Sequence, residues 1–249
     1  MTSVTVLAYH AVGRCAPADD PHNLWVSPEA FRRHLAYLAR SRRVVSLADA
    51  VDGRVEPGRP AVVVTFDDGY RSVLENAVPL LECHGFPATV FVPTKYIGDG
   101  NRWDPPTGCP LDIMTEGELR QAARRGLAVE SHGHSHLDFS GATFEVARDD
   151  LAPSLGRLAA VTGRRPRFLA YPFRAGSEEA QRAAAAVGFD AAFTIDLPHA
   201  GRFAWARVSV SPHDSVRLLA VKTSGRWPVV QGNPLLWTGY RVWRRLHRR

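Results

Sequence analysis

The sequence has few cysteines and no long apolar run. Its 249 residues include three cysteines, Cys15, Cys83 and Cys109, an odd number without the close spacing of metal ligands. This count argues against a disulfide framework and suits a reducing compartment. No segment approaches the roughly 18 consecutive apolar residues of a membrane-spanning helix, and the first ten residues lack the basic start and apolar stretch of a signal peptide. These absences together predict a cytoplasmic protein.

Acidic residues are absent from the C-terminal end. The whole chain carries a net charge of +6, and no Asp or Glu occurs from Gly225 to Arg249. Aromatic side chains interleave with the basic ones there, at Trp227, Trp237, Tyr240 and Trp243. We expect residues 226–249 to form a basic aromatic tail that either contacts an anionic membrane face or packs its aromatics onto the domain as a solvated end. Nucleic acid is not an expected partner, because a basic tail alone provides no groove-reading element or stacking platform.

Short β-rich runs alternate with helical patterns over residues 1–225, which we predict to be one catalytic domain. The composition, 45% hydrophobic and 22% charged, is typical of a soluble globular protein. The predicted strands are Val4–Tyr9, Ala61–Phe66, Ala88–Val92, Leu127–Glu130, Phe168–Tyr171 and Ala191–Ile195. The predicted helices are Pro28–Ser41, Tyr70–His84, Thr115–Arg125, Phe144–Val161 and Ser177–Val187. Repeated strand–helix units indicate a parallel sheet with right-handed crossovers, so the expected fold is an α/β, distorted (β/α) barrel of about seven strands.

Paired carboxylates follow the most hydrophobic of these strands, in the sequence Thr65-Phe66-Asp67-Asp68-Gly69. Adjacent carboxylates repel each other unless a cation or a shared proton relieves the repulsion. Since side chains alternate along a strand, one carboxylate is free to bind a metal while the other takes a proton. The competing interpretation is an ordinary turn, because Asp-Gly is a common turn pair.

Three histidines lie within five residues after the strand Leu127–Glu130, at His132, His134 and His136. A helical turn would bring His132 and His136 to one side. Two imidazoles and one carboxylate leave positions open for water and substrate on a divalent metal. The competing interpretation is a surface histidine cluster, and His134 is the member that we expect to point to solvent.

Together the two motifs resemble the first two motifs of the polysaccharide deacetylases, carbohydrate esterase family 4. The resemblance extends over about residues 6–225. It implies that Asp67 is the catalytic base and that Asp68, His132 and His136 bind a divalent metal, for which Zn²⁺ is the expected ion. Chemistry in such barrels occurs where strands end and loops begin, and we expect the long loop of residues 98–110 to lie over that mouth.

The third family motif, Arg-x-Pro-Tyr-Gly, is altered in the matching stretch from Ala170 to Arg174. Phe173 stands at the Tyr position, where the family uses a backbone amide to hold the oxyanion, so the substitution keeps the donor. Ala170 replaces the Arg that steadies the base, and Arg207 from another strand is the candidate replacement. Arg174 replaces the Gly. The residues expected to contact substrate are Tyr171, Arg174 and Trp103.

The last family motif, a Leu-x-His near the C-terminus, is not found. Family members that act on poly-N-acetylglucosamine carry a Tyr-His on the first strand instead, in a permuted arrangement, and Tyr9-His10 resembles that version. The resemblance therefore implies that His10 is the general acid. Two alternatives remain open: His10 is a core histidine bonded to a carbonyl, or His213 is the acid.

The resemblance implies a hydrolase that removes an N-acetyl or other N-acyl group from a sugar or glycan and needs no organic cofactor. In the reaction that the resemblance implies, a divalent metal would polarise a water and the acyl carbonyl, Asp67 would take a proton from the water, and His10 would give one to the leaving amine. A deformylase or deacetylase of a lipid- or nucleotide-linked sugar would use the same residues. A catalytically inactive carbohydrate-binding member is a further alternative, because one motif is missing and another lacks its Arg.

Overall fold

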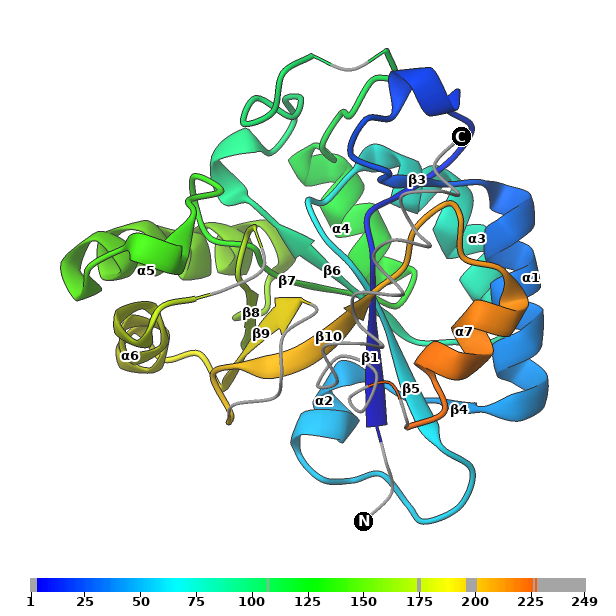
Figure 1. Ribbon diagram of the computed structural model, residues 1–249. Coiled ribbons are helices and arrows are strands. Elements are labelled where there is room, and N and C mark those ends of the chain that lie inside the picture. The colour runs from blue at the N-terminus through cyan, green and yellow to red at the C-terminus, as the bar shows by residue number, and fades with distance from the viewer. Residues whose placement is uncertain (1–3, 107, 174–175, 196–200, 226, 228–249) are drawn as a thin grey trace.

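The computed structural model describes residues 4–106, 108–173, 176–195, 201–225 and 227 (Figure 1). The strands are β1 (Val4–Tyr9), β2 (Ala11–Val12), β3 (Trp25–Val26), β4 (Arg43–Val44), β5 (Ala61–Phe66), β6 (Ala88–Val92), β7 (Leu127–Ser131), β8 (Phe168–Ala170), β9 (Ala191–Ile195) and β10 (Trp205–Ser209). The helices are α1 (Pro28–Ser41), α2 (Leu47–Val51), α3 (Val78–Glu82), α4 (Glu116–Arg124), α5 (Phe144–Thr162), α6 (Glu178–Val187) and α7 (Val216–Lys222). A π-helical turn, η2 (Val73–Ala77), precedes α3, and short 3-10 turns are η1 (Pro17–Asp19), η3 (Thr94–Tyr96) and η4 (Phe139–Gly141).

Seven parallel strands close into a barrel in the described part of the chain. Their order is β1-β10-β9-β8-β7-β6-β5, and β5 pairs back onto β1 along its whole length. The closure is irregular, because β7 and β8 share a single register pair, Ser131 with Leu169. The edge of β5 that faces β6 is also divided, since β4 pairs with its first two residues and β6 with its last three. The expected distorted barrel of about seven strands is confirmed.

Alternation along the strands separates two hydrophobic regions. All six residues of β5 are buried, as expected of a strand covered on both faces. Val62, Val64 and Phe66 pack outward against α1 and α3, whereas Val63 belongs to an inner cluster with Phe91. Helix α2 closes that inner cluster from the other end through Leu47, Ala50 and Val51. The barrel is therefore a packed, mainly apolar core, and Arg207 of β10 is a fully buried charged residue inside a strand.

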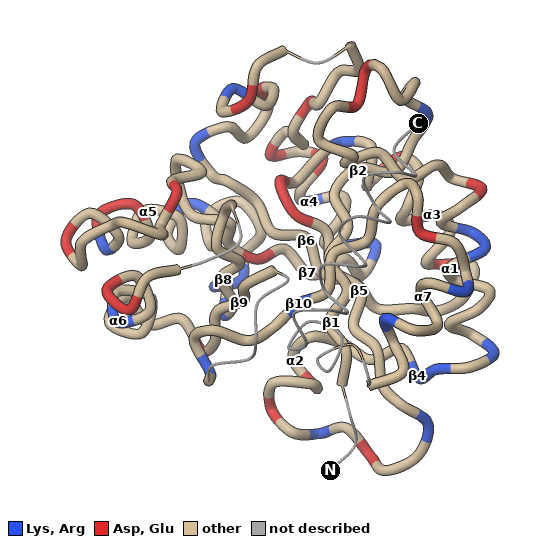
Figure 2. Tube along the Cα trace, viewed as in Figure 1, with Lys and Arg blue, Asp and Glu red and all other residues tan. Residues whose placement is uncertain are grey.

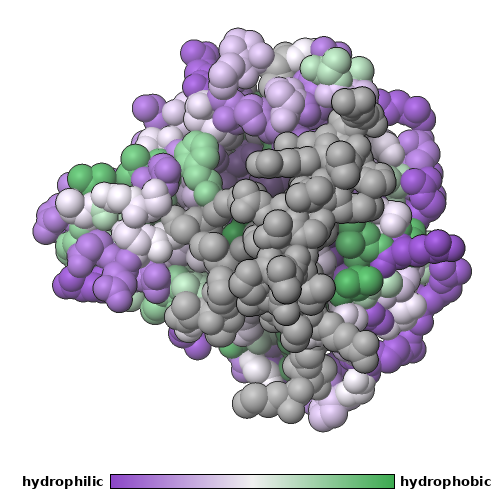
Figure 3. Space-filling view, viewed as in Figure 1, coloured by the Kyte–Doolittle hydropathy of each residue, from purple (hydrophilic) through white to green (hydrophobic). Residues whose placement is uncertain are grey.

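Helices surround the barrel, and polar side chains cap the start of several of them. In Figure 1, α1, α3 and α7 lie on one side and α5 and α6 on the other. Ser27 accepts a hydrogen bond from the Ala30 amide at the start of α1, and Thr115 and Glu118 form a capping box at the start of α4. Charged residues lie mainly on these helices and their loops (Figure 2). Among the residues coloured by hydropathy in Figure 3, hydrophobic ones lie in small separate patches on this face.

The elements β2, β3, β4, β10, α2 and α7 and the disulfide are not predicted from the sequence. Strand β10 is absent from the predicted strands because a fully buried arginine, Arg207, interrupts its apolar pattern. The expected lack of disulfides is wrong for two of the three cysteines: Cys15 and Cys109 form a disulfide across 94 residues, and Cys83 is free and exposed. Their pairing depends on two loops meeting, which an odd cysteine count does not reveal.

The predicted tail of residues 226–249 lies outside the described residues except for Trp227. That indole is buried in the main core beside Lys222. Among the described residues, no helix combines the length and apolar character that crossing a membrane requires.

Candidate metal centre

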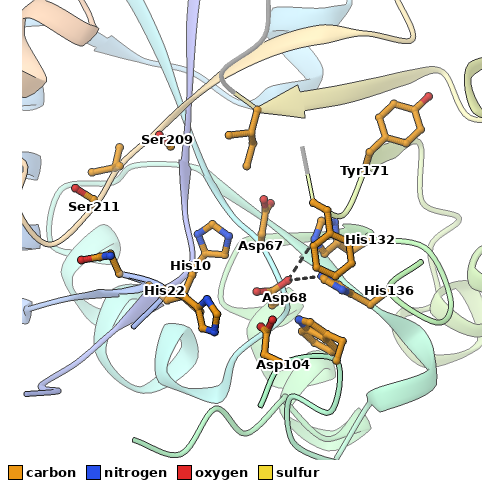
Figure 4. A pocket seen from close by; sticks show the side chains of 16 residues that line it. His10, His22, Asp67, Asp68, Asp104, His132, His136, Tyr171, Ser209 and Ser211 are labelled. Carbon is orange, nitrogen blue, oxygen red and sulfur yellow. Dashed lines mark hydrogen bonds and ion pairs between the residues drawn. The ribbon is translucent and has the colours of Figure 1, made fainter. Parts of the chain in front are cut away.

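A pocket of about 300 Å³ opens at the carboxyl ends of the barrel strands (Figure 4). Strand alternation explains which side chains reach it. Val6 and Val63 point into the barrel, so His10 and Asp67, at even spacings from them, also point inward and reach its mouth. The lining residues are His10, His22, Asn23, Leu24, Asp67, Asp68, Trp103, Asp104, His132, His136, Tyr171, Phe173, Ile195, Ser209, Val210 and Ser211.

Three buried side chains, Asp68, His132 and His136, converge in this pocket. Their candidate ligand atoms lie within 4.8 Å of one another. Oδ1 of Asp68 is 3.2 Å from Nε2 of each histidine. A tetrahedral site with bonds of about 2.0–2.1 Å has ligand atoms about 3.3 Å apart, so this spacing fits a small divalent ion.

The imidazoles are oriented as metal ligands require. Nδ1 of His132 donates to the carbonyl of Ala170 at 2.7 Å, which leaves Nε2 as the lone-pair nitrogen facing Asp68. The His136 ring stacks on Trp103 at 3.9 Å between centroids and meets Phe173 edge-on at 4.7 Å. Nδ1 of His136 is buried and has no partner among the described residues. Two neutral imidazoles and a carboxylate are a donor set for Zn²⁺ and similar ions.

A loop, and not the expected helical turn, brings the two histidines together. His136 has a positive φ of 56°, and Gly133 before it has φ 75°. Asp150 of α5 closes this loop by accepting hydrogen bonds from the amides of His134 and Ser135, both at 2.9 Å. The His134 imidazole bonds to Thr94 Oγ1 and does not point to open solvent, and it is not part of the ligand group.

Asp67 lies beside the metal residues and is held by Arg207. The guanidinium donates from Nη1 to Oδ1 at 2.6 Å and from Nη2 to Oδ2 at 2.9 Å, and both side chains are buried. Nη1 also donates to Thr65 Oγ1, and the guanidinium lies over the Phe91 ring. Strand β10 thus supplies the guanidinium that Ala170 cannot.

Charge and burial compete at both carboxylates. Burial raises the pKa of Asp67, but the adjacent Arg207 charge outweighs it and holds the pKa below its usual range. Burial likewise opposes ionisation of Asp68, yet the Nε2 atoms of His132 and His136, each 3.2 Å from its Oδ1, hold its pKa well below the usual range. Burial lowers the pKa of His136 despite the neighbouring Asp68, which favours a neutral ring. The pocket therefore contains two ionised carboxylates and an unprotonated imidazole, as metal binding and proton abstraction require.

Backbone strain is concentrated at the same pocket. Four residues other than glycine have positive φ in the described part of the chain: Asn23, Asp68, His136 and Phe173. All four line the pocket. Such conformations cost about 1–3 kcal/mol each and persist where surrounding structure enforces them, commonly at functional sites.

The two candidate acids have different environments. His10 lines the pocket with Asp67 and Asp68, and no described residue forms a hydrogen bond with its imidazole. His213 is not among the lining residues, and its Nε2 bonds to Oδ1 of Asn23 at 2.9 Å. The geometry favours His10, although its role remains a prediction.

The residues predicted to hold the oxyanion or to contact substrate differ in how far they are available to a ligand. Phe173 is half exposed at the rim, and no described residue accepts a hydrogen bond from its N–H. Tyr171 lines the pocket, but its hydroxyl donates to the Phe203 carbonyl at 3.1 Å. Trp103 covers His136, and Arg174 lies outside the described residues. Five polar lining residues belong to no recognisable motif and are not predicted from the sequence: His22, Asn23, Asp104, Ser209 and Ser211.

Comparison with known proteins identifies the family of this chain. The family model described as polysaccharide deacetylase matches residues 54–192. The Bacillus subtilis protein YxkH, which bears the name of that family, is 27% identical over 217 residues, covering 83% of this chain and 71% of its own. A poly-beta-1,6-N-acetyl-D-glucosamine N-deacetylase of Staphylococcus epidermidis is 25% identical over 235 residues, covering 84% of this chain and 79% of its own.

Solved structures share the fold. The Streptococcus pyogenes deacetylase PplD, in complex with acetate, aligns with a TM-score of 0.76 at 20% identity, over 89% of this chain and 98% of its own. IcaB from Ammonifex degensii aligns with a TM-score of 0.75 at 24% identity, over 90% of this chain and 97% of its own.

Proposed function

Because this chain belongs to the polysaccharide deacetylase family, we propose that it hydrolyses the N-acetyl group of an N-acetylated glycan in the pocket described above. One observation carries the proposal: a buried Asp68–His132–His136 group lies beside a second carboxylate, Asp67, that an arginine keeps ionised. The first group supplies metal ligands and the second a base.

The metal ligands are Asp68, His132 and His136, and Zn²⁺ is the ion that we propose. When bound there, a divalent ion would supply Lewis acidity toward the acyl carbonyl and lower the pKa of a water to about 7. Trp103 and Phe173 flank the His136 ring and shield it from bulk solvent.

Asp67 is the proposed general base. Its two oxygens accept hydrogen bonds from Arg207, which fixes the orientation of the carboxylate and keeps it unprotonated. A carboxylate uses its remaining lone pairs to accept a further proton, so the pairing does not block its role. Proton transfer by a positioned group contributes about 10²–10⁴-fold to rate.

His10 and Phe173 complete the proposed machinery. His10 reaches the pocket from the end of β1 and donates a proton to the leaving amine. The Phe173 N–H, at the rim beside His136, donates a hydrogen bond to the oxygen that becomes negative in the transition state. The Tyr9-His10 pair and the Staphylococcus epidermidis relative support placing the chain in the permuted subgroup, with poly-N-acetylglucosamine as the substrate to test first.

For location, we propose an oxidising compartment and not the cytoplasm. The cytoplasmic expectation rests in part on the absence of disulfides, and Cys15–Cys109 removes that support. Alkylating the free thiols in unlysed cells and identifying the modified cysteines by mass spectrometry tests this location. We expect Cys83 to be modified and Cys15 to be unmodified.

A peripheral membrane contact through residues 226–249 stays a proposal, tested by comparing vesicle binding of the full chain with that of a chain ending at 227.

The decisive test measures acetate release from N-acetylglucosamine oligomers together with metal content. We expect Asp67→Asn to keep about one metal per chain and to lose activity at least about 10²-fold. His132→Ala is expected to lose both metal and activity. Retained turnover in Asp67→Asn contradicts the proposed base, and a metal-loaded wild type that hydrolyses no N-acetyl sugar indicates the inactive, carbohydrate-binding alternative. Formate release, or activity confined to lipid- or nucleotide-linked sugars, indicates the other alternative.

A further inference from the structure

Two loops form the wall of the pocket opposite the barrel strands. The loop between β2 and β3 contributes His22, Asn23 and Leu24, and the loop after η3 contributes Trp103 and Asp104. Figure 4 shows the labelled side chains of His22 and Asp104 in the same space as Asp68 and His10. The base, the metal ligands and the proposed acid all come from elsewhere, and of this wall only Trp103, which stacks on His136, has a role so far.

Asn101 holds the second loop in place against the metal residues. Its Oδ1 accepts hydrogen bonds from the amides of Trp103 at 3.2 Å and Asp104 at 3.1 Å. Its Nδ2 donates to Oδ2 of Asp104 at 2.9 Å and to the Tyr70 hydroxyl at 3.1 Å. The Trp103 indole stacks on His136, so Asp104 occupies a fixed position one residue beyond a ring that touches a metal ligand.

A covalent link joins this loop to the first one. The Cys15–Cys109 disulfide connects them, and Gly108 lies so close to Asp19 that a β-carbon at residue 108 would collide with its carboxylate. Asp20 fixes the first loop internally by accepting hydrogen bonds from the amides of Leu24 and Trp25, at 2.9 and 3.0 Å. The wall is therefore assembled before any ligand arrives.

The chemistry of the wall suits an uncharged sugar ring. Oδ1 of Asp104 accepts no hydrogen bond from a described residue, and the His22 imidazole, exposed at the rim, has no described partner. No Arg or Lys occurs among the described lining residues, so they offer no guanidinium or ammonium group for a phosphate. An ionised carboxylate with an open oxygen is a strong acceptor for hydroxyl donors.

We propose that Asp104 is a specificity-determining residue that accepts hydrogen bonds from ring hydroxyls of the N-acylated sugar, and that Asn101 and the Cys15–Cys109 disulfide position it. This inference rests on the proposed deacetylase function and adds the group that recognises the sugar. Asp104 acts on binding and not on the acyl carbon.

The test compares Asp104→Ala with a matched control, Asp99→Ala, which removes a carboxylate from the same loop where it pairs with exposed Arg102. With N-acetylglucosamine oligomers, we expect Asp104→Ala to raise KM about tenfold or more, with kcat changed less than about threefold and metal content unchanged. The control is expected to match wild type. An unchanged KM in Asp104→Ala overturns the proposal, as does loss of metal, which would make Asp104 a metal ligand.

Analogues that each lack one ring hydroxyl identify the contact. Wild type is expected to lose at least about tenfold in kcat/KM on one analogue, and Asp104→Ala to lose nothing further on it, because the partner hydroxyl is already absent. Equal additional losses by Asp104→Ala on every analogue overturn a direct contact.

Calorimetric titration measures the binding contribution without turnover. In the inactive Asp67→Asn background, adding Asp104→Ala is expected to weaken the Kd for an N-acetylglucosamine oligomer by about tenfold. Adding Asp99→Ala to the same background is expected to leave the Kd unaltered. Equal Kd values with and without Asp104→Ala would overturn the proposed role in binding.

A separate variant tests whether the Cys15–Cys109 disulfide positions Asp104. The double variant Cys15→Ser/Cys109→Ser, kept well below its melting temperature, is expected to raise KM in the same direction, and adding Asp104→Ala should increase KM less than the two effects multiplied. An unchanged KM in a folded double variant overturns the positioning role of the disulfide. If wild type hydrolyses no N-acyl sugar, the proposed function itself fails; if it does and Asp104→Ala equals the control, only this inference fails.

Discussion

At the scale of single residues, the buried pair of Asp67 and Arg207 combines structural and chemical roles. Each partner is almost fully buried, so either charge alone would lie in the barrel without compensation. Removing one partner of a buried pair typically costs about 3–5 kcal/mol, because the other charge is left unpaired. The pair therefore links stability to the orientation of the base.

We expect Arg207→Met to lower the free energy of unfolding by about 3–5 kcal/mol and to reduce kcat/KM strongly. The double variant Arg207→Met/Asp67→Asn should recover part of the stability, since the amide carries no charge, but none of the activity. Urea unfolding and acetate release measure the two effects. If Arg207→Met alone were as stable as wild type, the ion pair would not contribute to the stability of the fold.

Functional residues that lie close together in the sequence form recognisable motifs and can be predicted. Functional residues that only the folding of distant loops brings together cannot. Asp67-Asp68 and His132 to His136 stand in short motifs that follow strands, so the sequence predicts that they share one end of the barrel, although it does not predict the loop that turns His136 toward Asp68. Asp104 carries no such signal, because its position depends on Asn101 and on a disulfide to a distant loop. The nearest signal is its neighbour Trp103, for which the sequence predicts a substrate contact.

At the scale of elements, α5 holds the histidine loop from outside the barrel. Asp150 accepts hydrogen bonds from two backbone amides of that loop, and its Oδ2 lies where a β-carbon on Gly133 would collide with it, at 2.9 Å. The helix and the strand β7 are predictable because their hydrophobic patterns are regular. The loop geometry is not, because it requires positive φ at His136, which is uncommon for residues other than glycine.

Asp150→Ala is expected to weaken metal affinity by about 10–100-fold, the usual effect of losing an outer partner of a metal ligand. The amides of His134 and Ser135 would lose their acceptor, so the His136 imidazole would no longer be held toward Asp68. Competition with a chelator of known affinity measures the change. Asp149→Ala, a neighbouring exposed residue paired with Arg148, is the control and should leave the affinity unaltered.

A buried polar network joins β1, α1 and α7 below the pocket. The Tyr9 hydroxyl lies 3.2 Å from Nδ1 of His34, whose Nε2 donates to the Asp214 carbonyl at 2.8 Å. Lys222 pairs with the Asp214 carboxylate at 2.5 Å. Burial lowers the pKa of His34 below 6.5, and the Asp214 hydrogen bond only partly offsets it, while Arg33 and Lys222 add to the lowering.

This network predicts a loss of stability in acid. Since native His34 binds fewer protons than unfolded His34, the free energy of unfolding should fall as pH drops below about 6.5 toward the lower native pKa. His34→Gln should flatten this part of the profile, because glutamine does not titrate. Urea unfolding at about pH 7.5 and about pH 5.5, on either side of the unfolded pKa, provides the comparison. An equal pH dependence in the variant would assign the effect to another group.

At the scale of the whole molecule, the metal site connects two strands of the closed barrel. Asp68 follows β5, and His132 follows β7, with β6 between them. The barrel itself is predictable from alternating strand and helix patterns. Its irregular closure is not, because the split edge of β5 and the single register pair between β7 and β8 arise from packing among distant elements.

Metal removal should therefore destabilise the entire domain. A ligand that binds only the native state stabilises it by about 2.7 kcal/mol when present at about 100 times its Kd. We expect dialysis against a chelator to lower the Tm and Zn²⁺ at that excess to restore it, whereas His132→Ala should show the low Tm with or without the ion. A Tm independent of metal in wild type would mean that the ion contributes nothing to folding.

The left-handed backbone at Asp68, His136 and Phe173 has a consequence for how the chain would respond to selection for heat resistance. Glycine adopts that conformation without steric conflict, so replacing any of the three with glycine relieves a local penalty. Two of those replacements delete a metal ligand. Libraries screened for survival at high temperature in the presence of a chelator should accumulate glycine at these positions, and libraries screened for deacetylation should retain the costly side chains.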